Sequence, residues 1–262
     1  MNFNMTFGDI MNFGFVLKFN ALNQHMLTPA TQVILTVSAI LVVMVAAYLL
    51  GSLNFAIIIS GKQFKQDIRN FGSKNAGMTN MMRTYGKKAA GLTLLGDALK
   101  AVVAAIVGYL LLGQLGAYIA GVMCVVGHMF PVFYRFRGGK GVVTTAISIL
   151  MCNPLVFAIL FLIFVIIVAF TKYISLGSVM SVLLYPLVLD RIERLFGGGS
   201  PYTLFAVIIT VLVVVKHREN IKRLLNHTES KFSFKKSVKA SEVKSEPSPA
   251  EVSEHKEENV NK

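Results

Sequence analysis

Long apolar runs constrain this chain more than any other feature. Several windows of roughly 15 to 25 residues are almost wholly apolar, which is long enough for a helix to cross a hydrocarbon core of about 30 Å. Inside lipid the backbone must satisfy its own hydrogen bonds, so these runs are predicted to be helices. Because 54% of the 262 residues are apolar, we predict an all-α polytopic membrane protein.

The distribution of Lys and Arg predicts the topology. Residues 60–88 carry seven Lys and Arg against one Asp, which places this segment in the cytoplasm and the N-terminus outside. The basic segments 135–140 and 216–223 fit the same side, so the chain crosses an even number of times between them. The expected spans are residues 33–59, 89–112, 115–133, 141–152, 154–170, 174–189 and 202–215.

This topology of about seven spans places the turn at residues 172–178 and the C-terminus in the cytoplasm. Five spans with two re-entrant segments remain the alternative. Proline at position 154, after Asn153, is the predicted interruption between two of the apolar segments.

The chain divides into three parts by composition. Residues 1–32 form an N-terminal extension, either amphipathic or loosely ordered, without the features of a signal peptide. Residues 33–230 form the transmembrane domain, and residues 231–262, with seven Lys against six Glu, are predicted to be a disordered charged tail.

The net charge of +13 therefore lies almost entirely on the membrane part. At this hydrophobicity, anionic lipid headgroups explain the basic residues better than nucleic acid does, so no nucleic-acid partner is expected. Cys124 and Cys152 are predicted to be core thiols, and we expect neither a metal site nor a cofactor.

Residues 72–83 combine glycines, hydroxyl groups, amides and two basic side chains between apolar runs. Such a loop can turn backbone N–H groups inward around a phosphate, although a polar solvated connector is the alternative. Two further polar segments, residues 137–141 and 216–223, are expected at the same membrane face. Three such segments at one face favour a site for a phosphorylated ligand.

Other polar residues in the apolar segments have plainer explanations. Asp97 and Lys100 are three residues apart on one helix, so they can share a face and neutralise each other, either in a functional role or as a structural ion pair. His128 is expected to pack or to form a hydrogen bond near a helix end. Three methionines are expected to pack beneath the polar loop: Met78, Met81 and Met82.

Four motifs occur in order: Gly51-Ser52-Leu53-Asn54-Phe55, Gly-Ser-x-Asn-x-Gly-x-Thr-Asn-x-x-Arg from Gly72, Gly-Gly-Lys-Gly from Gly138, and His-Arg-Glu-Asn-Ile-Lys-Arg-Leu from His217. Together they resemble the PlsY-type acyl-phosphate:glycerol-3-phosphate acyltransferases. The resemblance implies a bacterial cell-membrane enzyme of phospholipid biosynthesis with a cytoplasmic active site. Its substrates would be acyl phosphate and glycerol 3-phosphate, its products lysophosphatidic acid and phosphate, and membrane lipid its surroundings.

The resemblance also implies the site residues. The implied catalytic residues are Ser73, Arg83, Lys140, His217 and Asn220. The implied substrate-binding residues are Asn75, Gly77, Thr79, Gly139, Ser175 and Ser178. Two positions depart from the family pattern, because Asn54 stands where proline is common and Lys74 where glycine is frequent.

These residue types suit two phosphorylated substrates. Arginine and lysine bind phosphate, and holding both substrates by their phosphates would align the glycerol hydroxyl with the acyl carbonyl. His217 has three interpretations: a general base, a group that only orients the hydroxyl, or a helix-end cap, of which the orienting role is favoured.

Other functions stay open on the sequence alone. A transporter for a phosphorylated anion would carry polar residues through the middle of several spans, whereas here they gather at one face. A non-catalytic membrane scaffold would have no use for the phosphate loops. The residues themselves do not decide between acyl phosphate, acyl-CoA and acyl carrier protein as the donor, and they leave the oligomeric state open.

Overall fold

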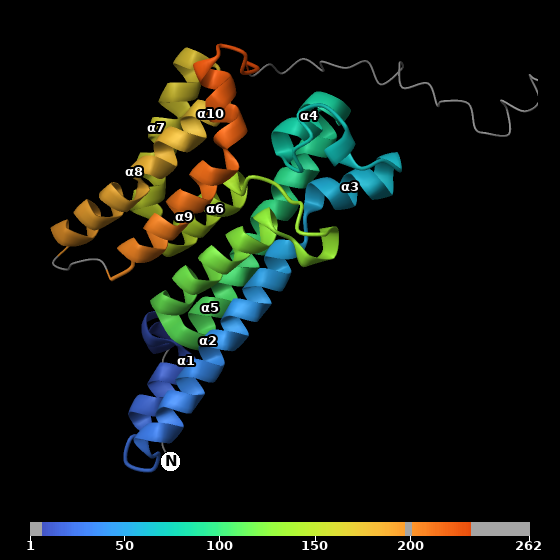
Figure 1. The fold of residues 1–262 in the computed structure, drawn as a ribbon. Coiled ribbons are helices and arrows are strands. Elements are labelled where there is room, and N and C mark those ends of the chain that lie inside the picture. The colour runs from blue at the N-terminus through green and yellow to red at the C-terminus, as the bar shows by residue number, and fades with distance from the viewer. Residues whose placement is uncertain (1–6, 197–200, 232–262) are drawn as a thin grey trace, which may run out of the picture.

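The computed structural model describes residues 7–196 and 201–231, and within them the regular structure is helical (Figure 1). The α-helices are α1 (Phe7–Leu22), α2 (Pro29–Ser52), α3 (Phe55–Phe64), α4 (Met78–Tyr85), α5 (Lys87–Met129), α6 (Val142–Cys152), α7 (Pro154–Thr171), α8 (Ile174–Leu195), α9 (Thr203–Lys216) and α10 (Arg218–Leu225). Two short 3-10 helices are η1 (Ile68–Asn70) and η2 (Val132–Tyr134).

Helix α5 is a hairpin of two helices. At Leu112 and Gly113 the backbone leaves the helical conformation, and Gly113 has a φ of 60°. A Cβ atom added to Gly108 would lie 2.2 Å from the carbonyl oxygen of Gly116, and one added to Gly116 would lie 2.1 Å from that of Gly108. The two glycine backbones are therefore in contact, and only glycine permits this close approach. The two arms match the predicted segments 89–112 and 115–133.

The hairpin turn marks one end of the helix bundle. The Gln114 amide donates to the carbonyl of Cys152 at 2.8 Å, which places the end of α6 beside the turn. The rings of Tyr118 and Tyr202 stack with their centroids 4.3 Å apart, so the start of α9 lies nearby.

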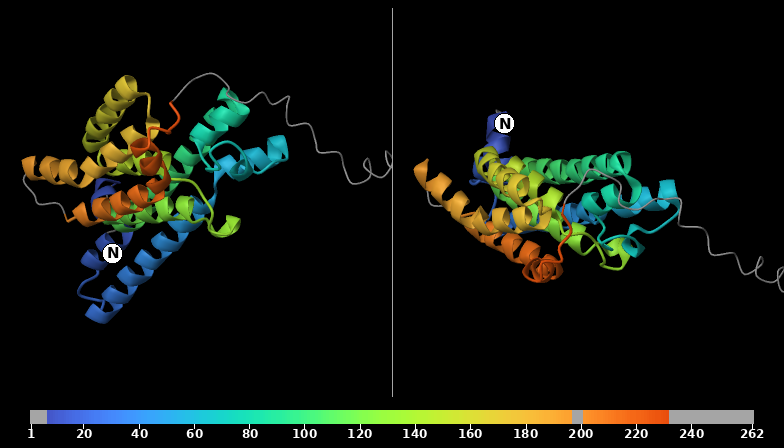
Figure 2. Two further views of the ribbon diagram at one scale, coloured as in Figure 1. Left: turned by 45° about the horizontal axis from the view of Figure 1, so that its top comes forward. Right: turned by 90° about the horizontal axis from the view of Figure 1, so that it is seen from above.

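The motif segments mark the opposite end. Ser175 at the start of α8 donates to Glu229, which follows α10, at 2.8 Å. Helices α6 to α9 therefore run alternately between the two ends, and the turn at residues 172–178 lies with the motifs, as parity predicted. Figure 1 shows α4 and α10 at this end and α1 toward the other, and in Figure 2 α3 and α4 extend to one side.

Within residues 7–196 and 201–231, four helical stretches are long and apolar enough to cross a membrane: Pro29–Phe64, Lys87–Tyr134, Pro154–Thr171 and Ile174–Leu195. The second contains the reversal of α5. Helices α6 and α9 are also apolar but shorter, with 11 and 14 residues. The expected apolar segments are thus helical, while the number of crossings stays a prediction.

The predicted span at residues 33–59 lies within the apolar stretch Pro29–Phe64, but it contains two helices. Helix α2 ends at Ser52, and Asn54 begins α3 because its side-chain oxygen accepts a hydrogen bond from the Ile57 amide at 3.2 Å. The amide nitrogen of Asn54 donates to the carbonyl of Ala76 at 3.3 Å. The predicted cytoplasmic segment at residues 60–88 also contains regular structure, namely the end of α3 and all of α4.

The N-terminal extension includes a helix that packs on the hairpin. Gly14 has a φ of 72°, and a Cβ atom there would lie 2.2 Å from the Gly113 nitrogen. Helix α1 therefore covers the turn of α5 through a close backbone contact. Of the predicted tail at residues 231–262, all but Lys231 lies outside the described residues.

The packing of the predicted core residues is confirmed. Cys124 and Cys152 are buried free thiols. Met81 is fully buried with Ile68 and Ala76 in an apolar cluster, and Met78 and Met82 pack against that cluster. This cluster supports the polar loop that precedes α4.

Candidate active site

Asn80 holds the first motif loop in shape. This buried side chain accepts a hydrogen bond from the Ser73 amide at 2.9 Å and donates to the carbonyls of Phe71, at 2.9 Å, and Asn75, at 3.1 Å. Lys74 adopts a left-handed conformation with a φ of 58°, which explains why glycine suits this position in the family pattern. The loop is thus folded around one amide, with Ser73 exposed at its surface.

Gly139 brings the second motif against the first. A Cβ atom at this position would lie 2.3 Å from the His128 Nε2 atom and 2.4 Å from the carbonyl oxygen of Ala76. The backbone amide of Gly139 also donates to the carbonyl of His128 at 3.1 Å. Only a residue without a side chain fits between these groups, so loop 72–77 and loop 137–141 form one unit.

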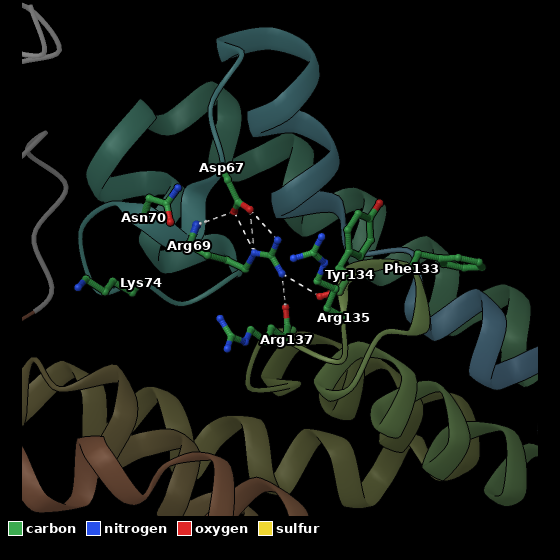
Figure 3. A pocket seen from close by; sticks show the side chains of 9 residues that line it. Asp67, Arg69, Asn70, Lys74, Phe133, Tyr134, Arg135 and Arg137 are labelled. Carbon is green, nitrogen blue, oxygen red and sulfur yellow. Dashed lines mark hydrogen bonds and ion pairs between the residues drawn. The ribbon is translucent and has the colours of Figure 1, made fainter. Parts of the chain in front are cut away.

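Arg69 joins the same two segments at their outer side (Figure 3). Its guanidinium is paired with Asp67 at 2.6 Å, and it donates to the carbonyls of Tyr134 and Arg137 at 3.0 Å each. The hydrogen bonds from Arg69 lower the pKa of the Asp67 carboxyl. A pocket of about 450 Å³ lies beside Arg69, and Lys74 contributes to its basic lining.

A buried ion cluster lies below Gly139. The Lys100 ammonium contacts the Asp97 carboxylate at 2.8 Å, the His128 Nδ1 atom at 2.9 Å and the Gly51 carbonyl at 3.0 Å. The predicted neutralisation of Asp97 by Lys100 is therefore confirmed. The cluster also bonds the His128 ring against which Gly139 packs, so it supports the second motif from below.

The third motif meets the second at Lys140. The Lys140 ammonium donates to the side-chain oxygen of Asn220, the one buried residue of α10. Burial, with the positive charges of Arg223 and Arg83 nearby, lowers the pKa of Lys140 to about 8, although the negative charge of Glu229 opposes this. Most of the Lys140 side chains therefore carry a positive charge at pH 7.

His217 lies at the end of α9, and its side chain is 2% exposed. Its Nδ1 atom is 2.8 Å from the carbonyl oxygen of Val213, which can only accept, so the ring carries its proton on Nδ1. Burial lowers the pKa of His217 to about 4, and the charge of Lys140 acts in the same direction. The ring is therefore neutral at pH 7, and its Nε2 atom can accept a hydrogen bond.

Glu229 binds three donors from two helices at this site. Its carboxylate accepts from Ser175 at 2.8 Å, from the Asn220 amide at 2.7 Å and from the Arg223 Nε atom at 2.7 Å. Arg83 donates to the carbonyl of the next residue, Ser230, at 3.4 Å. Donors from α4, α8 and α10 are therefore gathered around one short segment.

The structure brings four of the eleven sequence-predicted site residues to this point. Lys140, Asn220 and Ser175 are in the hydrogen-bonded cluster, and Arg83 reaches it through Ser230. Thr79 lies one turn before Arg83 on α4.

Within the described residues, the remaining predicted side chains form no hydrogen bond with this cluster. Ser73, Asn75 and Gly77 belong to the loop against which Gly139 packs. Ser178 differs, because its hydroxyl donates to the Ile174 carbonyl of its own helix. Sequence reasoning did not single out Asn80, Arg223 or Glu229, although Asn80 lies within the first motif.

Comparison with known proteins agrees with this arrangement. The sequence model described as Glycerol-3-phosphate acyltransferase matches residues 41–227. The chain belongs to the glycerol-3-phosphate acyltransferase family. A family member from Thermoanaerobacter pseudethanolicus is 42% identical over 195 residues, covering 74% of this chain and 96% of the relative. One from Syntrophomonas wolfei subsp. wolfei is 44% identical over 192 residues, covering 73% and 96%.

Two solved structures of the family member PlsY, an integral membrane glycerol 3-phosphate acyltransferase, share the fold. The glycerol 3-phosphate form has a TM-score of 0.66 at 34% identity, covering 74% of this chain and 96% of that one. The lysophosphatidic acid form has a TM-score of 0.64 at 32% identity, covering 76% and 97%. The all-α multi-pass membrane fold and the acyltransferase function predicted from the sequence are therefore confirmed.

Proposed function

We propose that this acyltransferase moves a fatty acyl group from acyl phosphate to a hydroxyl of glycerol 3-phosphate. The products would be lysophosphatidic acid and inorganic phosphate. The contact of Lys140 with Asn220, beside Ser175 and Arg223, carries the proposal, because it gathers phosphate donors from three separate segments. One of the PlsY structures holds glycerol 3-phosphate and the other lysophosphatidic acid, which supports the same acceptor and product here.

The proposed site has two sets of phosphate donors. The first is the loop that Asn80 shapes, which meets the second motif where Ala76 approaches Gly139 and which carries Ser73, Asn75 and Gly77, with Thr79 following on α4. The second comprises Arg83, Lys140, Asn220 and a serine of α8. Of the two candidate serines, Ser175 points into the cluster, whereas Ser178 is bonded to its own helix.

Catalysis in this scheme comes from alignment and charge. The glycerol oxygen attacks the acyl carbonyl carbon, the bond from that carbon to the phosphate oxygen breaks, and the hydroxyl proton ends on the departing phosphate. Lys140 and Arg83 stabilise the phosphate charge that develops as the bond breaks. Holding both substrates by their phosphates raises the effective concentration of the hydroxyl, which can lower the barrier by about 7 kcal/mol or more.

His217 orients the acceptor in this proposal. A base with a pKa of about 4 is poorly matched to proton removal at neutral pH, which favours a base with a pKa near 7. Its neutral ring, with Nδ1 bonded to Val213, offers Nε2 as an acceptor for the glycerol hydroxyl. The helix-end cap, which the sequence favoured least, occurs together with this role, because the Nδ1 atom bonds the Val213 carbonyl in the last turn of α9.

The site is proposed to face the cytoplasm of a bacterial cell, with the N-terminus outside. The supporting observation is the excess of Lys and Arg at the motif end of the bundle. Transport of a phosphorylated anion is the second candidate, but the ion pair that lies deeper, Asp97 with Lys100, is buried and neutralised.

Purified protein in lipid nanodiscs tests the proposal. Lysophosphatidic acid is measured with glycerol 3-phosphate and, in turn, acyl phosphate, acyl-CoA and acyl carrier protein at equal concentration. We expect product with acyl phosphate, loss of product in K140M, and retention in K222M, which removes an exposed lysine of α10. Binding of glycerol 3-phosphate with no product from any donor would refute the proposal.

A further inference from the structure

A basic pocket lies on the outer side of the two motif loops, apart from the proposed acyl-transfer cluster (Figure 3). Its volume is about 450 Å³, and none of the eleven site residues predicted from the sequence lines it. Its single carboxylate, that of Asp67, is paired with Arg69 at 2.6 Å. The other charged groups of the lining are three cations: Lys74, Arg135 and Arg137.

These three cations are available to bind an anion. Their side chains are exposed, and none of them forms an ion pair with another described residue. Ammonium and guanidinium groups are the side chains that bind phosphate most strongly, and a cavity of this size suits a small ligand group better than the face of a protein. The pocket therefore has the chemistry of a phosphate site.

The backbone that carries the two arginines is fixed in an uncommon conformation. Arg135 and Phe136 both have a φ of 57°, in the left-handed region that residues with side chains seldom adopt. The Phe136 amide donates to the carbonyl of Pro131 at 3.0 Å, and Arg69 donates to the carbonyls of Tyr134 and Arg137. Such a conformation persists only where the surroundings impose it, and it is most frequent at binding sites.

Two apolar stretches that can cross a membrane end beside this pocket. The stretch Lys87–Tyr134 ends one residue before Arg135, and the stretch Pro29–Phe64 ends three residues before Asp67. Basic residues that directly follow a span lie at the level of the lipid headgroups, where anionic lipids attract them. The pocket is therefore expected at the membrane surface.

Exposed phenylalanines beside the cations favour a lipid over a soluble anion. Phe133 is 55% exposed and lines the pocket, and Phe136, between the two arginines, is 58% exposed. Free phosphate would gain nothing from apolar surface at the rim, whereas the acyl chains of a lipid would cover it. Cations and apolar rings side by side thus match a phosphate group that carries acyl chains.

We propose that this pocket binds the phosphate headgroup of an anionic membrane phospholipid. Lys74, Arg135 and Arg137 would hold the phosphate, and Phe133 would contact the acyl chains. The inference goes beyond the proposed function, because the lipid here is a bound ligand and neither substrate nor product. Since Lys74 belongs to the first motif loop and Arg137 to the second, the lipid would join the two loops, as Arg69 does.

Fluorescence quenching measures this binding directly. The chain contains no tryptophan, so F133W in proteoliposomes provides one fluorophore at the edge of the pocket. Quenching by brominated phosphatidylglycerol is compared with quenching by brominated phosphatidylcholine. We expect the anionic lipid to be preferred about fivefold or more, which is the effect of about one cation near an anionic lipid. Equal quenching by the two lipids would overturn the inference.

Charge variants on the F133W background locate the preference. R135N/R137Q should lose it, and asparagine at position 135 tolerates the left-handed backbone. K62Q/K222Q is the matched control, because it also removes two exposed positive charges, and it should keep the preference. An equal loss in both double variants would assign the preference to general surface charge and contradict the inference.

Inorganic phosphate distinguishes the two sources of the same chemistry. Added in excess at constant ionic strength, it should leave the preference for phosphatidylglycerol unchanged. If it abolishes the preference, the pocket takes a soluble anion and the inference is wrong.

Hydrogen exchange tests the wild type, which covers the case in which a variant is unstable. Amide exchange in residues 134–138 should be slower in phosphatidylglycerol than in phosphatidylcholine liposomes, and equal exchange would overturn the inference. None of these measurements uses an acyl donor or glycerol 3-phosphate. Failure here therefore leaves the proposed function intact, and absence of product in the acyltransferase assay leaves the lipid site intact.

Discussion

The partly depressed pKa of Lys140 predicts a specific pH dependence of catalysis. Its pKa of about 8 lies well below that of an ordinary lysine because the ammonium is buried beside Arg223 and Arg83. The charged form, which attracts phosphate, is therefore present below pH 8 and lost above it. With that pKa, about nine tenths of the free enzyme carries the charge at pH 7 and about one tenth at pH 9, so kcat/KM should fall about tenfold.

The assay measures initial rates of lysophosphatidic acid formation at limiting glycerol 3-phosphate from pH 6.5 to 9.5. The second phosphate pKa of a phosphomonoester is about 6, so the substrate charge hardly changes between pH 7 and 9. K140R supplies the control, because its guanidinium stays protonated over the whole range. Its activity can be lower at every pH, but its kcat/KM should not decline between pH 7 and 9.

Two results would contradict this reasoning. A flat wild-type profile up to pH 9.5 would mean that the charge of Lys140 is not needed or is not lost. The same decline in K140R would assign it to another group. Hydrolysis of the acyl phosphate without enzyme is measured at each pH and subtracted.

Three further substitutions test the site and its support. H217Q should raise the KM for glycerol 3-phosphate while kcat stays within about tenfold, whereas loss of a general base would lower kcat about 10²-fold or more. G139A should abolish activity and destabilise the protein by about 1–3 kcal/mol in thermal unfolding, while G61A, with open space around the added methyl, should leave the melting temperature unchanged or raise it. D97N leaves a buried charge on Lys100 and should cost about 3–5 kcal/mol, and the double variant D97L/K100M should cost less. A melting temperature of D97N equal to that of the wild type would contradict the last expectation.

The apolar runs were sufficient to predict which segments are helical. They did not predict where one polar side chain ends a helix and begins the next. The reversal in α5 was predicted, because one apolar segment was expected to end at Leu112 and the next to begin at residue 115. The position of Ser175 beside the motifs was predicted from the even number of crossings between the two basic segments. The break at Asn54 could not be predicted, because a span of apolar residues continues on both sides of it. There the polar side chain caps a new helix and the deeper Lys100 satisfies the Leu53 carbonyl at 2.7 Å, a contact between residues 47 positions apart.

The site was predictable where its chemistry is concentrated in motifs. Lys140 and Asn220 were chosen from separate segments, and the structure joins them directly. Asn80 was harder to identify because its function is to shape a loop through four hydrogen bonds, and composition does not reveal that. Glu229 carried no local signal, since a single Glu beside a Lys-rich and Glu-rich tail resembles its neighbours.

The charge of the Glu229 carboxylate acts on the Lys140 ammonium, and this coupling gives a final prediction. The negative charge of Glu229 raises the pKa of Lys140, so E229Q should move the alkaline decline of kcat/KM to a lower pH than in the wild type. An unchanged alkaline decline in E229Q would contradict this coupling. E219Q, which removes one negative charge from an exposed side chain of α10, is the control and should keep the alkaline decline at the wild-type pH.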